Sequence, residues 1–179
     1  MSLSSEGTPR LVAFEQLVAE YGDRVYAIAL RLTGSPTDAD DVMQEALLRA
    51  FQNWADFRGE AQASTWLYRI TVNAAAERAR NRQREPEAAE PLDDLDVPDW
   101  SSDVGQIVAQ QELRQEIEAA ILRLPIELRS VLVLRDIEGQ STAETMTILG
   151  ASEGKVKARL HRARVILRRE LGRLLGREP

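Results

Sequence analysis

The sequence predicts an all-α protein made of two small helical domains joined by an extended acidic linker. Two observations support this prediction. Apolar residues recur in steps of three and four along most of the 179 residues, which is the spacing of one helix face. Between the two periodic blocks, residues 85–104 hold eight acidic residues, no basic residue and three prolines, a composition that resists helix formation. The expected domains are therefore residues 10–84 and 105–175.

The bulk composition narrows the possible classes of protein. Hydrophobic residues make up 44 %, enough for packed cores, and the aliphatic run Val131–Leu134 is far too short to span a bilayer. The first residues lack a basic region followed by an apolar stretch, so we expect a cytoplasmic chain without membrane insertion. The absence of cysteine excludes disulfides and zinc–thiolate sites, and the single histidine, His161, lies in a basic segment without a nucleophile motif. We expect neither a cofactor nor enzymatic activity.

The first domain is predicted to hold three helices. The first is marked by an apolar stripe and ends at Gly34; the stripe comprises Phe14, Leu17, Val18, Tyr21, Val25, Ile28, Ala29 and Leu32. Ser35 can cap the second helix, Pro36 suits its first turn, and Asp38 can complete a capping box. A loop around Gly59 leads to a third helix that continues to about residue 84. This third helix is apolar at its start and carries five Arg against one Glu from residue 69 onward.

The second domain is predicted to hold four helices. One ends before Pro125 and the next ends near Gly139. Ser141 and Glu144 form a capping box that opens a short helix, and Gly150 permits a sharp turn after it. The last helix is expected to begin after Ser152, with core positions at Val156, Leu160, Ala163, Leu167 and Leu171.

The last two helices match a helix-turn-helix, in which the second helix enters the major groove of DNA. Residues 155–173 hold eight Lys or Arg against one Glu. The side opposite the core positions consists of Gly154, Lys157, Ala158, His161 and Arg162. Lys157 and Arg162 can reach a guanine edge or a phosphate, whereas Lys155, Arg159, Arg164 and Arg168 flank this side and suit phosphates. The alternative is a solvated basic helix, which we disfavour because acidic partners four residues away are missing from the pattern.

Two further groups of residues suggest function. Phe57 and Arg58, together with Asn73 on the basic third helix, could stack an unpaired base and bond its edge, whereas Trp66 is read as a core residue. For Phe57 and Asn73, a core position and a base-binding position are equally compatible with the pattern. The polar face of the second helix, residues 38–45, could hold a metal, but one helix gives poor convergent geometry. We therefore expect this face to dock a basic partner surface.

These segments together resemble the extracytoplasmic-function (ECF) sigma factors, which direct bacterial RNA polymerase to promoters. The resemblance covers most of residues 11–172 in the right order. Its motifs are Asp38–Ala46, Phe57–Glu60, Thr65–Asn73, Leu124–Pro125, Leu134–Gly139 and Ser152–Arg164. The chain departs from the family at Thr145 and Met146, where an apolar and a small residue are usual.

The resemblance implies a role for each surface. Asp41, Gln44 and Glu45 would dock the β′ clamp of core RNA polymerase, and the second domain would rest on the β flap. The minus-ten element of promoter DNA would be held by Phe57, Arg58, Asn73 and Arg80. The minus-35 element would be read by Gly154, Lys155, Lys157, Ala158, Arg159, His161 and Arg162. The acidic linker would thread through the RNA channel, and an anti-sigma factor would silence the protein.

Two other function classes remain possible at this stage. A stand-alone helix-turn-helix transcriptional regulator would explain the basic last helix but not the first three helices or the acidic linker. A metal-dependent hydrolase or nuclease would use the acidic second helix, with Asp40 and Asp41 as ligands. In the free protein, the two domains are expected to move relative to each other, because a flexible linker joins them.

Overall fold

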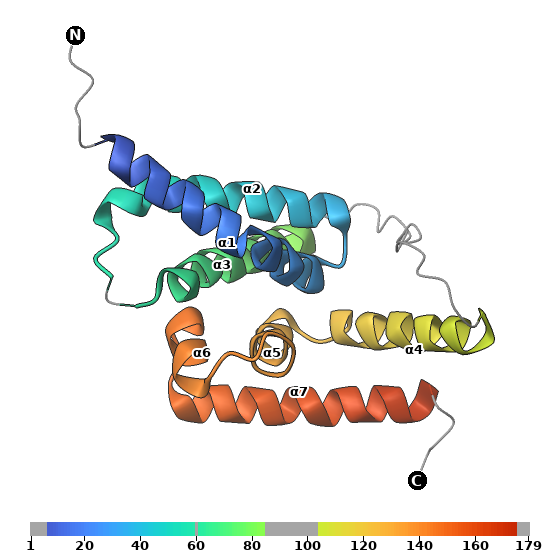
Figure 1. The fold of residues 1–179 in the computed structure, drawn as a ribbon. Coiled ribbons are helices and arrows are strands. Elements are labelled where there is room, and N and C mark those ends of the chain that lie inside the picture. Colours follow the sequence, from blue (N-terminus) through green and yellow to red (C-terminus); the bar gives the residue numbers. More distant parts are fainter. Residues whose placement is uncertain (1–6, 60, 85–103, 175–179) are drawn as a thin grey trace.

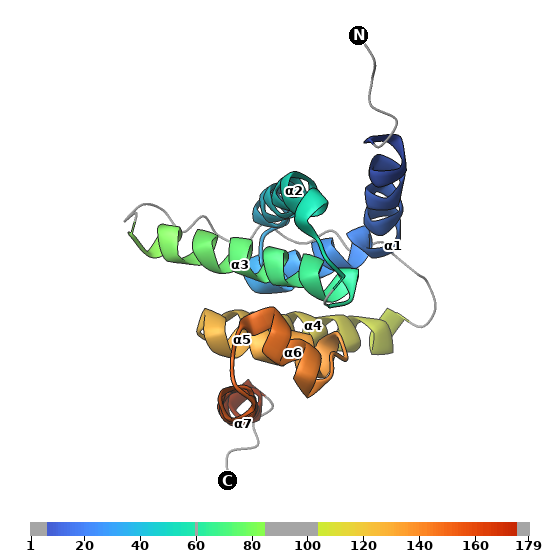
Figure 2. The ribbon, with the colours of Figure 1, turned by 90° about the vertical axis from the view of Figure 1, so that its left-hand side faces the viewer.

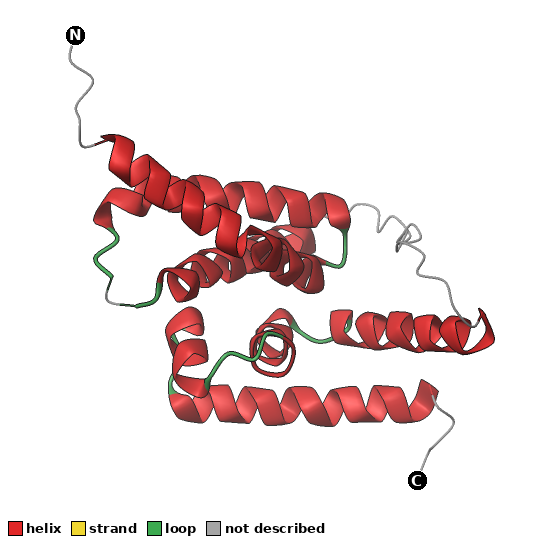
Figure 3. Ribbon diagram, viewed as in Figure 1, coloured by secondary structure: helices red, strands yellow, loops and turns green. Residues whose placement is uncertain are grey.

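The computed structural model describes residues 7–59, 61–84 and 104–174, and every regular element in these ranges is a helix (Figure 3). The prediction of an all-α fold is thus confirmed. No helix within the described ranges has both the length and the apolar character needed to cross a membrane. The predicted linker, residues 85–104, lies outside the described residues except for Val104, which is already helical.

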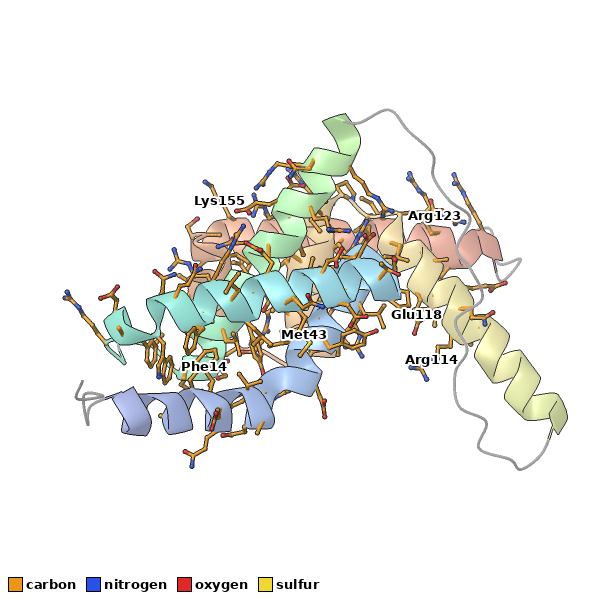
Figure 4. All side chains as sticks on the ribbon, turned by 90° about the horizontal axis from the view of Figure 1, so that it is seen from above. Phe14, Met43, Arg114, Glu118, Arg123 and Lys155 are labelled. Atoms are coloured by element: carbon orange, nitrogen blue, oxygen red, sulfur yellow. The ribbon has the colours of Figure 1, made fainter. Side chains whose placement is uncertain are left out.

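The N-terminal half packs three helices against one another: α1 (Gly7–Thr33), α2 (Pro36–Asn53) and α3 (Ala63–Arg84), with a short 3-10 turn η1 (Trp54–Asp56) after α2. Phe14 of α1 and Met43 of α2 point into the space between these two helices (Figure 4). The apolar stripes predicted from the sequence form the core of this half, which includes Val25, Ile28, Val42, Leu67 and Tyr68.

The C-terminal half contains α4 (Val104–Leu122), α5 (Ile126–Leu132), α6 (Thr142–Leu149) and α7 (Glu153–Leu174). Its core includes Leu124, Val131, Leu134, Ile148 and Val156. Seen from above, the part of α4 that carries Arg114 and Glu118 extends away from the other helices (Figure 4).

A π-helical turn, η2 (Val133–Ile137), continues α5, and the sequence did not predict it. Its wide turn is closed by a hydrogen bond from the Glu138 N–H to the Val133 carbonyl, 2.8 Å long. The predicted end near Gly139 is confirmed, since this glycine adopts a positive φ of 69°. Residues 131–134 are all apolar and buried, so one extra residue here leaves no visible break in the apolar pattern.

The capping predictions are confirmed with one correction. Ser141 and Glu144 form both bonds of a capping box at the start of α6, and Ser35 caps α2 by accepting from the Asp38 N–H. The Asp38 carboxylate, however, does not return to the cap. It is buried and accepts from Arg78 and Arg82, at 2.6 Å each, so it ties the start of α2 to the end of α3. Two flexible guanidinium groups compete for the carboxylate here and displace the expected local bond.

The two halves lie against each other. Helix α3 runs along the boundary, with α5 and α6 facing it from the other half, and α7 lies on the outer side (Figures 1 and 2). Buried apolar residues of both halves form one continuous cluster. The sequence did not predict this contact, because the linker composition says nothing of contacts between the domains it joins. The motion of the two domains in the free protein stays a prediction.

Candidate nucleic-acid interface

Helices α6 and α7 form the helix-turn-helix that the sequence predicted. Gly150 ends α6 in the left-handed conformation, with φ of 57°, and the Ala151 N–H donates to the Met146 carbonyl at 3.1 Å. Thr145, where the family pattern has an apolar residue, is fully buried, and its hydroxyl donates to the Ser141 carbonyl at 2.8 Å. This internal bond removes the cost of burying the hydroxyl, so the departure leaves the helix crossing intact.

The side of α7 that was predicted to face DNA is exposed. Val156 and Ala163 are buried against the core, as predicted, and Leu160 is buried with them. The residues on the opposite side are all exposed: Gly154, Lys155, Lys157, Ala158, His161 and Arg162. Arg159 is half-buried on the flank of this surface. We call this exposed set the α7 face; a contact of any of its residues with DNA stays a prediction.

The expectation that α7 lacks acidic partners four residues away is wrong at Lys157, and Arg164 has a partner on another element. Lys157 pairs with Glu153 one turn earlier, at 2.6 Å, and Lys157 lowers the pKa of Glu153 through a hydrogen bond and its charge. Arg164 forms two hydrogen bonds with Asp136 of η2, at 2.6 and 2.8 Å. The Lys157 pair is exposed and breaks at little cost, whereas two hydrogen bonds hold Arg164 to η2 of its own half.

A surface pocket of about 380 Å³ lies where α2, η1 and α3 meet. Its lining contains Phe57 and Asn73, which the sequence associated with base capture, so the structure brings these two residues together. The other lining residues are Arg49, Asn53, Asp56, Trp66 and Ile70. Its volume falls within the common range for ligand pockets, about 300–1,000 Å³.

Aromatic rings form one wall of this pocket. Phe57 stacks on Trp54, with ring centres 5.2 Å apart and planes 6° apart, and lies 5.1 Å from the Trp66 ring. Phe14 of α1 supports Trp54 from behind at 5.6 Å. Trp66 was read as a core residue, but it is only half-buried and lines the pocket. Such a wall of preassembled rings suits the stacking of a planar base.

Arg49 is a pocket residue that sequence reasoning missed. It is held between two carboxylates, Glu45 and Glu77, at 2.7 Å each. Its hydrogen bond lowers the pKa of Glu77. The spacing of four residues from Glu45 was the available signal, whereas the bridge to Glu77 of α3 needs the tertiary structure. Arg49 thus gives the pocket a positioned positive charge.

The remaining residues assigned to the minus-ten element lie outside this pocket. Arg58 is exposed and lines a neighbouring pocket together with Arg69 and Thr147, the last from α6 of the other half. Arg80 is exposed near the end of α3 and lines neither pocket. Of the predicted set, the structure therefore brings Phe57, Asn73 and, at its edge, Arg58 together, and it places Arg80 apart.

The acidic face of α2 is exposed at Asp41, Gln44 and Glu45. Asp41 accepts from Arg78 at 2.8 Å, and Glu45 accepts from Arg49, so each carboxylate already has a cationic neighbour. Within the part of the chain that the structure describes, no three His, Cys, Asp or Glu side chains are arranged to hold a metal ion. The face therefore offers exposed acids that a basic partner surface can contact.

Comparison with known proteins gives two matches to family profiles. Sigma-70 region 2 matches residues 17–85, and Sigma-70, region 4 matches residues 114–167. The first match contains the pocket and the acidic face of α2, and the second contains the whole α7 face.

Individual relatives match almost the whole chain. The ECF RNA polymerase sigma factor SigM of Mycobacterium tuberculosis is 39 % identical over 162 residues, which cover 90 % of this chain and 79 % of SigM. The ECF RNA polymerase sigma factor SigW of Bacillus subtilis is 35 % identical over 166 residues, which cover 89 % of each protein. Among solved structures, CnrH in complex with the cytosolic domain of CnrY is 31 % identical, with a TM-score of 0.63 over 90 % of this chain and 88 % of CnrH.

Proposed function

The chain belongs to the extracytoplasmic-function (ECF) family of RNA polymerase sigma factors, and from this premise we propose which surface meets each partner. A sigma factor of this family recognises promoters for RNA polymerase, and this chain is one. It is a DNA-binding regulatory protein; we propose that it supplies binding energy and no bond chemistry, and that it acts in the cytoplasm beside the polymerase. Residues 10–84 act as region 2, residues 85–104 as linker and residues 105–175 as region 4.

The pocket lined by Phe57, Trp66 and Asn73 is the observation that supports the proposal most. A base of the minus-ten element, flipped out of the duplex, stacks on the Phe57 ring while the Asn73 amide bonds its edge. Flipping costs a few kcal/mol, and stacking on an aromatic ring returns about 1–3 kcal/mol. Arg49, fixed by two carboxylates, lies where it can contact the neighbouring phosphate.

The α7 face reads the minus-35 element in the major groove. Gly154 and Ala158 have small side chains and allow a close approach, while Lys157, His161 and Arg162 reach the base edges. Lys155 and Arg159 bind phosphates and fix the position of the helix without reading sequence. Arg58 and Arg80 contribute phosphate contacts on the minus-ten side.

Core polymerase meets the protein through two surfaces. Asp41, Gln44 and Glu45 of α2 dock the β′ clamp, where their charges meet basic residues. The C-terminal half rests on the β flap. Because the acids of α2 already face Arg49 and Arg78, docking exchanges internal ion pairs for intermolecular ones.

A second protein keeps this sigma factor inactive. CnrH was solved with the cytosolic domain of CnrY, and the sigma factor RpoE of Bartonella quintana was solved with the anti-sigma factor NepR. RpoE is 23 % identical to this chain, with a TM-score of 0.72 over 89 % of it and 96 % of RpoE, so it supports the fold alone. We propose that an anti-sigma factor covers the polymerase-binding surfaces of this chain.

The proposal is tested by transcription in vitro with core polymerase and a genomic DNA library, with the start sites read by sequencing. We expect a set of start sites that is absent without the protein. A stand-alone regulator would neither purify with core polymerase nor compete with the housekeeping sigma factor, so co-purification separates the two functions. Start sites identical with and without the protein would rule out the sigma function.

The eight acids of residues 85–104 occupy the RNA channel before the transcript does. This segment lies outside the described residues, and its charge alone supports the hypothesis: acids suit a basic channel as RNA phosphates do. Replacing the acids with Ser should change initiation and promoter escape, measured as the ratio of abortive to full-length transcripts. An unchanged ratio would remove the hypothesis.

A further inference from the structure

Helix α7 begins with an acidic residue, Glu153, although negative charge near DNA is repelled by the phosphates. From Glu153 to Arg164 the sequence holds five Lys or Arg and no other acid. The side chain of Glu153 is 58 % exposed, so packing in a core does not explain its presence. In helix-turn-helix proteins, the first residues of the second helix contact base edges. Given the role proposed for α7, Glu153 lies at the end of the helix that approaches the bases.

An ion pair directs the carboxylate of Glu153 toward the α7 face. The ammonium of Lys157, one turn later, lies 2.6 Å from a Glu153 carboxylate oxygen. An acid near a helix start often stabilises the helix itself, as Glu144 of α6 does by accepting from the Ser141 backbone N–H. Glu153 instead presents its carboxylate beside the Lys157 ammonium, which belongs to the α7 face.

The chemistry of the major groove limits what this carboxylate can contact. Guanine presents N7 and O6 there and thymine presents O4, all of which are acceptors, whereas cytosine presents its N4 amino group as a donor. Adenine presents a donor next to an acceptor. Lys157 lowers the pKa of Glu153, so the carboxylate is ionised at neutral pH and can only accept hydrogen bonds. Cytosine is therefore the base that suits the Glu153 carboxylate best.

The Glu153–Lys157 pair offers an acceptor and a donor side by side, 2.6 Å apart. A G·C base pair presents the complementary arrangement in the major groove, with the cytosine N4 donor next to the guanine O6 acceptor. These two base atoms are hydrogen-bonded to each other, so they lie about 2.9 Å apart. The ion pair thus matches the edge of one G·C base pair, with the carboxylate toward cytosine and the ammonium toward guanine.

Both members of the ion pair are exposed to solvent, 68 % at Lys157 and 58 % at Glu153. Water screens an exposed pair, so separating it costs little free energy. Arg164, in contrast, is held by two hydrogen bonds to Asp136. The side chains of Glu153 and Lys157 can therefore turn from each other toward the base edges.

We propose that Glu153 is a specificity-determining residue for the minus-35 element and selects a G·C base pair together with Lys157. The inference rests on the proposed role of the α7 face and adds a residue that lies outside the set assigned to that role. The carboxylate accepts from the cytosine amino group, and Lys157 donates to the guanine. Where guanine or thymine takes the place of the cytosine, the carboxylate faces acceptors, so Glu153 also lowers the affinity for incorrect sequences.

The test is binding of the polymerase–sigma complex to minus-35 elements that carry every single-base change. The unmodified protein should prefer a G·C pair at one position at least. Glu153→Gln should reduce this preference about three- to tenfold, because an amide keeps the shape but can donate as well as accept. Elements with thymine in place of the cytosine should bind this variant more tightly than they bind the unmodified protein. A mere loss of helix stability would weaken binding to all sequences alike.

The matched control is Glu118→Gln, which removes the same charge from an exposed pair of the same spacing, formed with Arg114 on helix α4. The part of α4 that carries this pair extends away from the other helices (Figure 4). The control should keep the base preference of the unmodified protein.

A second comparison separates reading a base from positioning Lys157. Glu153→Gln is made again in a Lys157→Gln background. A residue that acts only by holding Lys157 in place has no further effect once Lys157 is replaced, whereas a residue that reads cytosine still has one. We expect the cytosine preference to fall again in this background.

Four results overturn the proposal: no G·C preference in the unmodified protein, an unchanged preference in Glu153→Gln, an equal change on every sequence, or no effect in the Lys157→Gln background. If Arg162→Ala alters the base preference and Glu153→Gln does not, the α7 face reads the element and this inference alone fails. If no single-base change alters binding of the unmodified protein, the proposed role of the α7 face fails with it.

Discussion

At the scale of single residues, the cations of helix α7 differ in which part of the DNA they are expected to contact. Arg162 is exposed opposite the core, whereas Arg159 is half-buried on the flank. Arg162→Ala should weaken binding to the preferred minus-35 element by about 1–3 kcal/mol and relax base preference there. Arg159→Ala should weaken binding to all sequences alike. It should also reduce the slope of the logarithm of the binding constant against the logarithm of salt concentration by about 1.

The measurement is binding of the polymerase–sigma complex to minus-35 elements carrying every single-base change, at several salt concentrations. Arg173→Ala, near the end of α7, is a control that removes a charge far from the α7 face. Equal losses for Arg162→Ala on every sequence would assign that residue to phosphate contact.

The pocket ring makes a second residue-level prediction. Phe57→Ala should weaken capture of an unpaired minus-ten strand by about 1–3 kcal/mol, because it removes the stacking surface. The assay is binding of the polymerase–sigma complex to a forked template in which the minus-ten strand is already single. Leu48→Ala, an exposed apolar residue on the same half, is the control. Equal affinity of the Phe57 variant and the control for this template would show that the base lies elsewhere.

Single residues also show where sequence reasoning ends. The exposed set on α7 followed from helical periodicity, because one face of a helix is fixed once its core positions are known. Arg49 and Asp38 did not follow, since their partners Glu77, Arg78 and Arg82 lie on another helix. The prediction that Trp66 is a core residue was correct in part, because its side chain packs against the core and is still half-exposed.

At the scale of elements, the start of α6 depends on its capping box. The Ser141 hydroxyl accepts from the Glu144 N–H at 3.1 Å, and the Ser141 N–H donates to the Glu144 carboxylate at 2.7 Å. Ser141→Ala should lower the free energy of unfolding by about 1 kcal/mol, measured by denaturant titration. Thr147→Ala, which removes a hydroxyl within the same helix, should lower the free energy of unfolding by less than Ser141→Ala does. Equal losses would mean that the cap contributes no specific stability.

The same cap carries a pH dependence. Hydrogen bonds from Ser141 hold the pKa of Glu144 below its ordinary value. A carboxylate with a lowered pKa adds stability that is complete above the ordinary value, about 4.3, and is lost as pH falls through the lowered one. Glu144→Gln should therefore be less stable than the parent at pH 6, and the gap should close below about pH 4. A gap that stays constant from pH 6 to pH 3 would contradict this assignment.

At the scale of the whole molecule, the bonds that join Arg129 and Glu138 to helix α1 predict joint unfolding of the two halves. Every Trp, Tyr and Phe precedes residue 104, so tryptophan fluorescence reports the N-terminal half, whereas helical circular dichroism reports both halves. With Trp100→Phe as the background, the two signals should change at the same denaturant concentration. In Glu138→Gln they should separate, since the halves lose a shared contact. Separate transitions in the background chain would show that the halves unfold independently.

The two-domain layout was readable from the sequence, but the contact between the domains was not. Helix number, caps and the basic last helix each follow from local patterns. Arg129 and Glu138, by contrast, find partners about a hundred residues earlier in the chain, as the bonds to Leu32 and Arg31 show. No periodicity encodes such a pairing, and both residues read as ordinary surface charges in a helical stripe.

The π-helical turn at Val133–Ile137 positions two acidic residues, Asp136 within the turn and Glu138 directly after it. It amounts to one inserted residue, and it sets Asp136 toward Arg164 while Glu138 meets Arg31. Deleting a single residue here would restore regular winding and turn everything beyond it by about 100°. Both acids would then lose their ion pairs with arginine. The shortened turn would therefore weaken the attachment of α7 to η2 and the contact between the two halves in a single step.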